Sequence, residues 1–164
     1  GDVLEESLDV MHWALGQSDP EKWLGGDRAE IDELVAQNDG PFKHHLDRYK
    51  YENRYDGAVA EEHRTEAALI LSELDERLSN SDWLCGANAT FADYAILPFV
   101  RQFANTDRAW FDVQDWNHLR AWRERFLASE RFNSVMEKYP RCRAGDPEPI
   151  FPSTEVSPEE HTAN

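Results

Sequence analysis

The chain has 164 residues, a formal net charge of -16, 40% hydrophobic residues and 12% aromatic residues. This length and apolar content suit one domain with a sizeable core. The acidic balance argues against nucleic acid or an anionic membrane as a partner, because both need a basic face. No run of residues reaches the roughly 18 apolar positions of a membrane span. Two cysteines are too few for a disulfide framework, so we expect a reducing, cytoplasmic location.

Along the chain, apolar residues recur with helical spacing and never with a convincing period of two. Helix-breaking stretches separate these segments, among them "GQSDPEKW", "NDGP", "RYDG" and "LSNSDWLCGANA". The pattern predicts an all-α fold of about six to eight helices. From residue 144 the chain becomes proline-rich and loses the helical period, so 144–164 is expected to be an extended or disordered tail.

The stretch "ATFADYAILP", residues 89–98, predicts the start of a buried helix. Thr90 is the expected N-cap, with its hydroxyl accepting from the Asp93 N–H and the Asp93 carboxylate accepting from the Thr90 N–H. Almost every following position is apolar, which is typical of the central helix of a bundle. Pro98 removes one hydrogen bond inside that helix, so a kink is expected there.

The longer stretch "WLCGANATFADYAILPFVRQF" resembles the core helix of the C-terminal domain in glutathione transferases, with the preceding loop and the T-x-A-D capping box. "LDERLSNSDWLCG" and "HLRAWRERFLASERFNSVMEKYP" are similar to the neighbouring helices of that domain, in the expected order. "NDGPFKHHLDRYKYENRY" is similar to a group of bacterial transferase-like proteins. The resemblance covers roughly residues 3 to 152, and it implies the all-α glutathione transferase C-terminal bundle with a buried, capped and proline-kinked core helix.

The same resemblance implies a division of the chain. Residues 1–17 would be a remnant of the thioredoxin-like domain, 18–143 the all-α domain and 144–164 the tail. The first segment contains an L-x-E-S motif, on which Glu6 and Ser7 would bind the γ-glutamyl end of glutathione. Free N–H groups and a hydroxyl at a helix N-terminus suit a carboxylate. The alternative is that Ser7 simply caps its helix.

A second candidate site is "LDRYKYENRY", where Arg48, Tyr49, Tyr51 and Tyr55 mix aromatic surface with cations. In the family this helix would face the cleft between the domains and form the wall for the second substrate. The alternative is ordinary core tyrosines with snorkelling cations.

The nucleophile-bearing segment of the family is missing from this sequence, which contains no Cys-Pro pair. The resemblance therefore implies the C-terminal part of a longer enzyme, trimmed or expressed without its first domain, with no catalytic residue of its own. Cys85 precedes a helix start and could be reactive, or it could be inert in a packed loop. His44 and His45 are about 100° apart on one helix, so we expect them to be solvent-exposed and expect no metal site. We expect a charged, solvated face of one helix at Glu62, His63 and Glu66.

Three functions are consistent with these observations. The first is the helical half of a glutathione transferase, which uses glutathione as substrate with an apolar electrophile or a mixed disulfide. The second is a non-enzymatic interaction or scaffold module with the same fold. The third is a small-molecule carrier. In each case we expect a homo-oligomer, formed through the apolar surface that a thioredoxin-like domain would cover.

Overall fold

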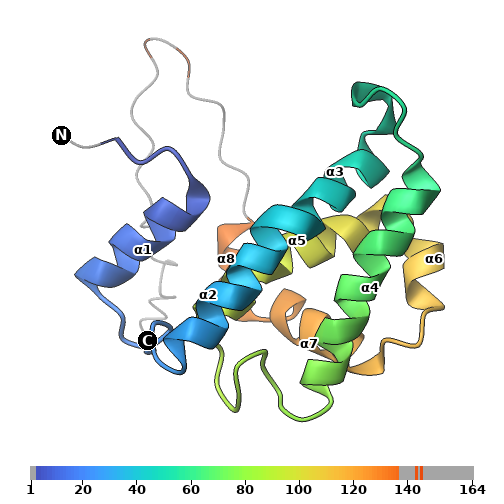
Figure 1. The fold of residues 1–164 in the computed structure, drawn as a ribbon. Coiled ribbons are helices and arrows are strands. Elements are labelled where there is room, and N and C mark those ends of the chain that lie inside the picture. The colour runs from blue at the N-terminus through green and yellow to red at the C-terminus, as the bar shows by residue number, and fades with distance from the viewer. Residues whose placement is uncertain (1–2, 137–142, 144, 146–164) are drawn as a thin grey trace, which may run out of the picture. The chain divides into compact units, whose positions relative to one another are not determined.

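The structure of the chain is a computed structural model that describes residues 3–136, 143 and 145. Figure 1 shows the arrangement of the helices. The α-helices and two short helical turns (η1, π-helical; η2, 3₁₀) are, in order, α1 (Ser7–Gln17), α2 (Arg28–Gln37), η1 (Asn38–Phe42), α3 (Lys43–Lys50), η2 (Glu52–Arg54), α4 (Ala60–Leu78), α5 (Phe91–Thr106), α6 (Arg108–Asp112), α7 (Asn117–Leu127) and α8 (Glu130–Val135). Within the described residues there is no strand, only an isolated bridge between Trp83 and Gly86, which confirms the predicted all-α fold.

Helix α5 forms the centre of the first compact unit, residues 1–127. It packs against α2, α3, α6 and α7, and it lies behind α2 and α3 in Figure 1. Its buried side chains come from nearly every side of the helix, as its continuous apolar sequence predicts: Phe91, Ala92, Asp93, Ala95, Ile96, Leu97, Val100, Phe103 and Ala104. The helix continues through Pro98 to Thr106, with the proline ring on the exposed side.

The stretch "NDGP" does not end a helix, in contrast to the prediction. The chain remains helical from α2 through η1 into α3, with Pro41 inside the π-helical turn. A proline ring clashes with the carbonyl of the fourth preceding residue in a regular α-helix, and a wider turn relieves that clash. The turn also buries Asn38 and Phe42. Helices α2 and α3 therefore form one nearly continuous helical segment at the front of Figure 1.

Helix α4 runs beside α3 and also contacts α7. Its side chains organise the start of α7: Asp75 accepts a hydrogen bond from the Leu119 N–H at 2.8 Å, and Ser72 accepts one from the Trp116 indole at 3.0 Å. Orphan N–H groups at a helix N-terminus need such acceptors. The α4–α7 contact is thus fixed by polar bonds at one end, in addition to its apolar packing.

The predicted capping box opens α5, with Thr90 as its N-cap and both halves of the box present. The Thr90 N–H and the Thr90 hydroxyl both donate to Oδ2 of Asp93, at 2.8 and 3.1 Å. The other carboxylate oxygen, Oδ1, accepts from the Leu84 N–H and from the Trp122 indole, each at 2.9 Å. One fully buried carboxylate therefore joins the start of α5, the preceding loop and α7.

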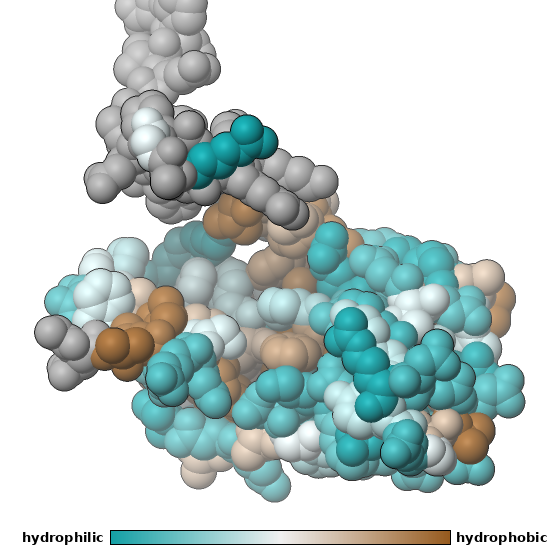
Figure 2. Space-filling view, turned by 90° about the horizontal axis from the view of Figure 1, so that it is seen from above, coloured by the Kyte–Doolittle hydropathy of each residue, from teal (hydrophilic) through white to brown (hydrophobic). Residues whose placement is uncertain are grey.

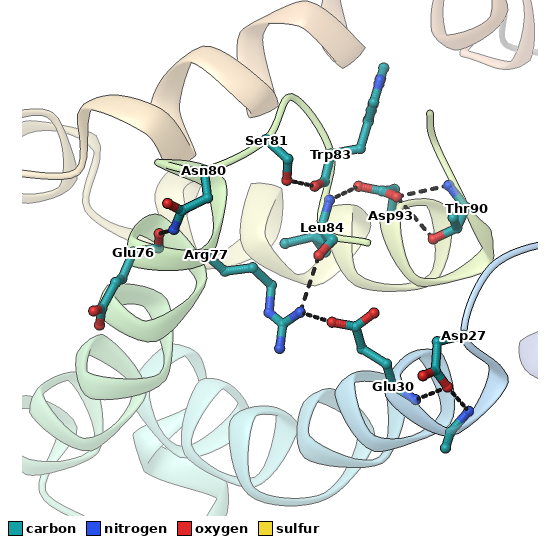
Figure 3. A network of polar contacts seen from close by, with 11 residues as sticks. Asp27, Glu30, Glu76, Arg77, Asn80, Ser81, Trp83, Leu84, Thr90 and Asp93 are labelled. Carbon is teal, nitrogen blue, oxygen red and sulfur yellow. Dashed lines mark hydrogen bonds and ion pairs between the residues drawn. The ribbon is translucent and has the colours of Figure 1, made fainter. Parts of the chain in front are cut away.

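This network extends further along the loop before α5 (Figure 3). The carbonyl of Leu84, whose N–H binds Asp93, accepts a hydrogen bond from Arg77 at 3.3 Å. Arg77 also forms an ion pair with Glu30 of α2. The peptide of Leu84 thus connects α2 and α4 on one side to α5 and α7 on the other. Burial raises the pKa of Asp93 above its ordinary value, and its four hydrogen bonds counteract that shift.

Helix α8 belongs to a second compact unit that begins at Ala128. Its N-cap, Ser129, accepts a hydrogen bond from the Phe132 N–H at 3.2 Å. The predicted tail, 144–164, lies outside the described residues apart from Gly145. Cys142 also lies outside them. Among the described helices, none is long and apolar enough to cross a membrane.

The Asp93 network predicts the effect of Asp93→Asn on stability. An amide nitrogen cannot accept the two hydrogen bonds from Thr90, and leaving buried donors unpaired costs about 1–3 kcal/mol. We expect urea unfolding to show a free energy of unfolding lowered by about that amount.

The matched control is Asp27→Asn. Asp27 caps α2 in an exposed setting by accepting from the N–H groups of Ala29 and Glu30. Asparagine is an equally good N-cap, so the control should leave stability unchanged. Equal stabilities of the two variants would contradict the importance of the buried network.

Candidate functional site

The most distinctive surface of the described chain lies at the end of α3 and in the following turn. Arg48 covers the ring of Tyr55 at 4.3 Å, and Arg54 covers the ring of Tyr51 at 4.2 Å. Lys50 lies 4.8 Å from the same Tyr51 ring. We call these five residues the cation–aromatic cluster. It presents both flat apolar faces and charged N–H donors to the surface.

Three of the four predicted substrate-binding residues, Arg48, Tyr51 and Tyr55, belong to this cluster. The fourth, Tyr49, lies in the core instead. It is only 9% exposed and its ring centroid is 5.1 Å from that of Phe103. Burial raises the pKa of its hydroxyl, which has no hydrogen-bond partner within the described residues. Tyr49 thus anchors α3, while its neighbours form the surface.

A depression of about 610 Å³ lies apart from the cation–aromatic cluster, between α2, α4 and the loop before α5. Its lining includes Glu30, Arg77, Leu84 and Cys85, so it overlaps the polar network of Figure 3. Sequence reasoning missed this depression, because Glu30 and Arg77 are 47 residues apart and no local motif marks them.

The predicted glutathione-binding residues lie at the start of α1. Glu6 occupies the N-cap position with extended backbone angles (φ -110°, ψ 150°) and its side chain makes no capping bond. Ser7 is the first helical residue, and both side chains are exposed. The N-cap is thus Glu6 and not Ser7. The helix is held to the core by Leu8, Met11 and Leu15, and by His12, which stacks on Phe91 at 4.2 Å.

Cys85 lies half-buried beside the N-terminus of α5. Burial raises the pKa of its thiol above the ordinary value. A thiol with a raised pKa carries little thiolate at neutral pH, and the thiolate is the nucleophile. The structure therefore favours the inert alternative for this residue.

Three histidines from two helices meet near the start of α3, which sequence reasoning did not foresee. His44 and His45 of α3 and His63 of α4 offer ring nitrogens that all lie within 4.8 Å of one another. His44 is exposed, as predicted, whereas His45 is half-buried. Loss of hydration lowers the pKa of both. His44 and His45 are adjacent on α3 and cannot form a metal site by themselves. His63, the third residue, comes from α4, and no local sequence pattern marks it.

Comparison with known proteins places this geometry in a family. Residues 32–130 match the family model described as glutathione S-transferase, C-terminal domain. This segment contains the capping box, the cation–aromatic cluster and the three histidines. No curated protein is similar enough in sequence to count as a match.

Several solved structures share the fold at low sequence identity. A glutathione S-transferase from Pichia kudriavzevii is 17% identical, with a TM-score of 0.66 over 81% of this chain and 67% of that one. One from Vibrio parahaemolyticus is 17% identical, with a TM-score of 0.65 over 80% and 65%. A glutathione transferase from Burkholderia graminis, solved with two glutathione molecules per subunit, is 23% identical, with a TM-score of 0.58 over 77% and 57%.

The present chain thus spans between 57% and 67% of these three transferases. At such identities the likeness shows the fold alone. The match to the family model spans more than half of the chain. The chain therefore belongs to the glutathione S-transferase C-terminal domain family.

Proposed function

We propose that this chain forms the second-substrate wall of a glutathione transferase, which conjugates glutathione to an apolar electrophile or acts on a mixed disulfide. The observation that carries the proposal is the cation–aromatic cluster, which lies inside the segment that matches the transferase family. Half-buried tyrosine rings suit an apolar group, and the arginines suit the carboxylates of glutathione. Tyr49 supports the wall from the core side of α3.

In this proposal Glu6 and Ser7 contact the γ-glutamyl end of glutathione, which carries both an ammonium and a carboxylate group. The N-terminus of α1 offers N–H groups and the Ser7 hydroxyl to the carboxylate. The Glu6 side chain makes no capping bond and is exposed, so it is available to the ammonium group.

The proposal assigns no catalytic residue to the described part of the chain. Activation of the glutathione thiol needs a side chain that lowers its pKa or donates to its thiolate. Cys85 has a raised pKa and lies in a packed loop, so it is poorly suited to attack a mixed disulfide. We therefore expect the chain to bind glutathione conjugates without turning glutathione over.

Residues 1–17 are proposed to be the last helix of a thioredoxin-like domain, with 18–143 as the all-α domain. The exposed side of this segment supports the proposal: Val10 and Trp13 of α1 are 46% and 57% exposed, and Val3 is 80% exposed. Figure 2 shows such hydrophobic side chains against a mostly hydrophilic surface. Val10 and Trp13 are three positions apart on α1 and share a face, and an apolar face is typical of a contact with another domain or chain. It also fits the alternative function, an interaction module.

Titration with S-hexylglutathione, which combines glutathione with an apolar group, tests the proposed wall. We expect the backbone NMR signals of Ser7, Tyr51 and Tyr55 to shift. Tyr55→Ala should weaken binding about two- to fivefold, because it removes a ring that would contact the hexyl group and that positions Arg48 by a cation–π contact of roughly 0.5–1 kcal/mol.

Trp83→Ala is the matched control, since Arg125 covers the Trp83 ring at 5.2 Å in a similar surface pair away from α3. It should bind S-hexylglutathione like the unchanged protein. The proposed wall is wrong if Tyr55→Ala and Trp83→Ala bind equally well. Turnover of glutathione with 1-chloro-2,4-dinitrobenzene by this chain alone would contradict the assignment of catalysis to other residues.

The apolar face of α1 predicts self-association of this chain. We expect sedimentation velocity to show a dimer whose population rises with protein concentration. Trp13→Lys should return the protein to a monomer, because a charge would replace an apolar contact. Val113→Lys is the control, since Val113 is 79% exposed near the end of α6. A concentration-independent monomer would argue against this interface.

A further inference from the structure

The three histidines at the start of α3 and in α4 form a compact cluster. Nδ1 of His45 and Nδ1 of His63 are 2.9 Å apart, although the residues are 18 positions apart in the chain. The ring of His44 lies 5.0 Å from that of His45 and 5.8 Å from that of His63, measured between centroids. The three rings therefore form a triangle that bridges two helices.

The packing of α3 on α4 creates this triangle. These two helices lie side by side (Figure 1) and form a close helix pair. Adjacent residues on one helix diverge by about 100°, and His44 is exposed whereas His45 is half-buried. His63 enters from α4 and approaches both. Together the two helices supply three imidazole ligands to one place, whereas adjacent residues of α3 alone could not bind the same ion.

The close approach of His45 and His63 also brings two potential ligand atoms together. A hydrogen bond between two ring nitrogens requires one to donate and the other to accept. A single shared proton thus occupies the space between two potential ligand atoms. If this proton moves to Nε2 of the same ring, both Nδ1 atoms have a lone pair available for a metal ion.

Acidic side chains adjoin the cluster. A depression of about 340 Å³ is lined by His45, His63, Thr65, Glu62 and Glu66. Glu66 follows His63 by three positions, so both lie on one face of α4. A carboxylate at this place can complete a set of four ligands and reduce the net charge of a bound cation. The nearby positive charge of Arg48 acts in the opposite direction.

Imidazole ligands favour zinc, copper and nickel over magnesium or calcium. Tetrahedral zinc with Zn–N distances of about 2.0–2.1 Å places its ligand nitrogens about 3.3 Å apart. The nitrogens here are separated by 2.9 Å in the closest pair and by no more than 4.8 Å in the widest. We expect rotation of the exposed His44 side chain to close the wider gaps.

We propose that His44, His45 and His63, with Glu66 as a fourth ligand, bind a divalent transition metal ion of the zinc type. The ion would link α3 to α4 next to the cation–aromatic cluster. Because the folded arrangement alone brings the three rings together, the bound ion would stabilise the folded protein.

Calorimetric titration of the untagged protein with zinc chloride tests this proposal. We expect one zinc ion per chain. His63→Gln and His45→Gln should each weaken binding about tenfold or more, the effect of removing a group that positions or ligates a metal. Glu66→Gln should weaken binding less. His118→Gln is the matched control, because His118 is an exposed single histidine on α7, and it should bind like the unchanged protein.

Thermal unfolding separates loss of the site from loss of the fold. Without metal, His63→Gln and His118→Gln should unfold cooperatively. Zinc should raise the unfolding midpoint of the unchanged protein and of His118→Gln by several degrees, and leave that of His63→Gln where it is. Cobalt should give the visible absorption bands of a tetrahedral site. Absence of saturable zinc binding, or equal binding by His63→Gln and His118→Gln, would overturn the proposal.

Discussion

The buried carboxylate of Asp93 is the interaction on which the rest of the fold depends. Both of its oxygens are occupied by donors from three segments: Thr90 at the start of α5, Leu84 in the preceding loop and Trp122 in α7. A buried carboxylate is costly unless such donors surround it. The loop and two helices must therefore take one arrangement to satisfy it. Through the Leu84 carbonyl the same network reaches Arg77 of α4 and Glu30 of α2.

This rigid centre leaves the outer face of α3 available for other chemistry. The helix is only eight residues long, yet it contributes to two clusters of different kinds. His44 and His45 at its start meet His63 of α4, and Arg48 near its end covers Tyr55. Tyr49 lies on the same helix, and its buried ring packs against Phe103 and holds α3 to the core. A metal ion that fixes α3 against α4 would also fix the helix that carries part of the proposed substrate wall, so the two proposals concern one structural element.

Local patterns predicted much of this structure, and contacts between distant residues account for what they missed. The Thr90–Asp93 box follows from a spacing of three residues, and Tyr49 shares its buried face with Leu46, three positions earlier, so its core position was readable. The family resemblance predicted the all-α transferase fold, and the family match confirms it. The meeting of His45 with His63 depends on how two helices pack. The helix continues through Pro41 because a wider turn accommodates the proline ring, and the local sequence pattern does not mark that turn.

Hydrogen exchange of the Trp122 indole N–H tests the central role of Asp93 most directly. This N–H donates to the buried carboxylate and its side chain is 1% exposed, whereas Trp13 is 57% exposed and serves as an internal reference. If the carboxylate organises the core, then in dilute, monomeric protein the Trp122 N–H should exchange only when the whole unit unfolds, and the exposed Trp13 N–H should exchange at once. Exchange of Trp122 at the rate of Trp13 would show that this bond opens locally and would contradict the account.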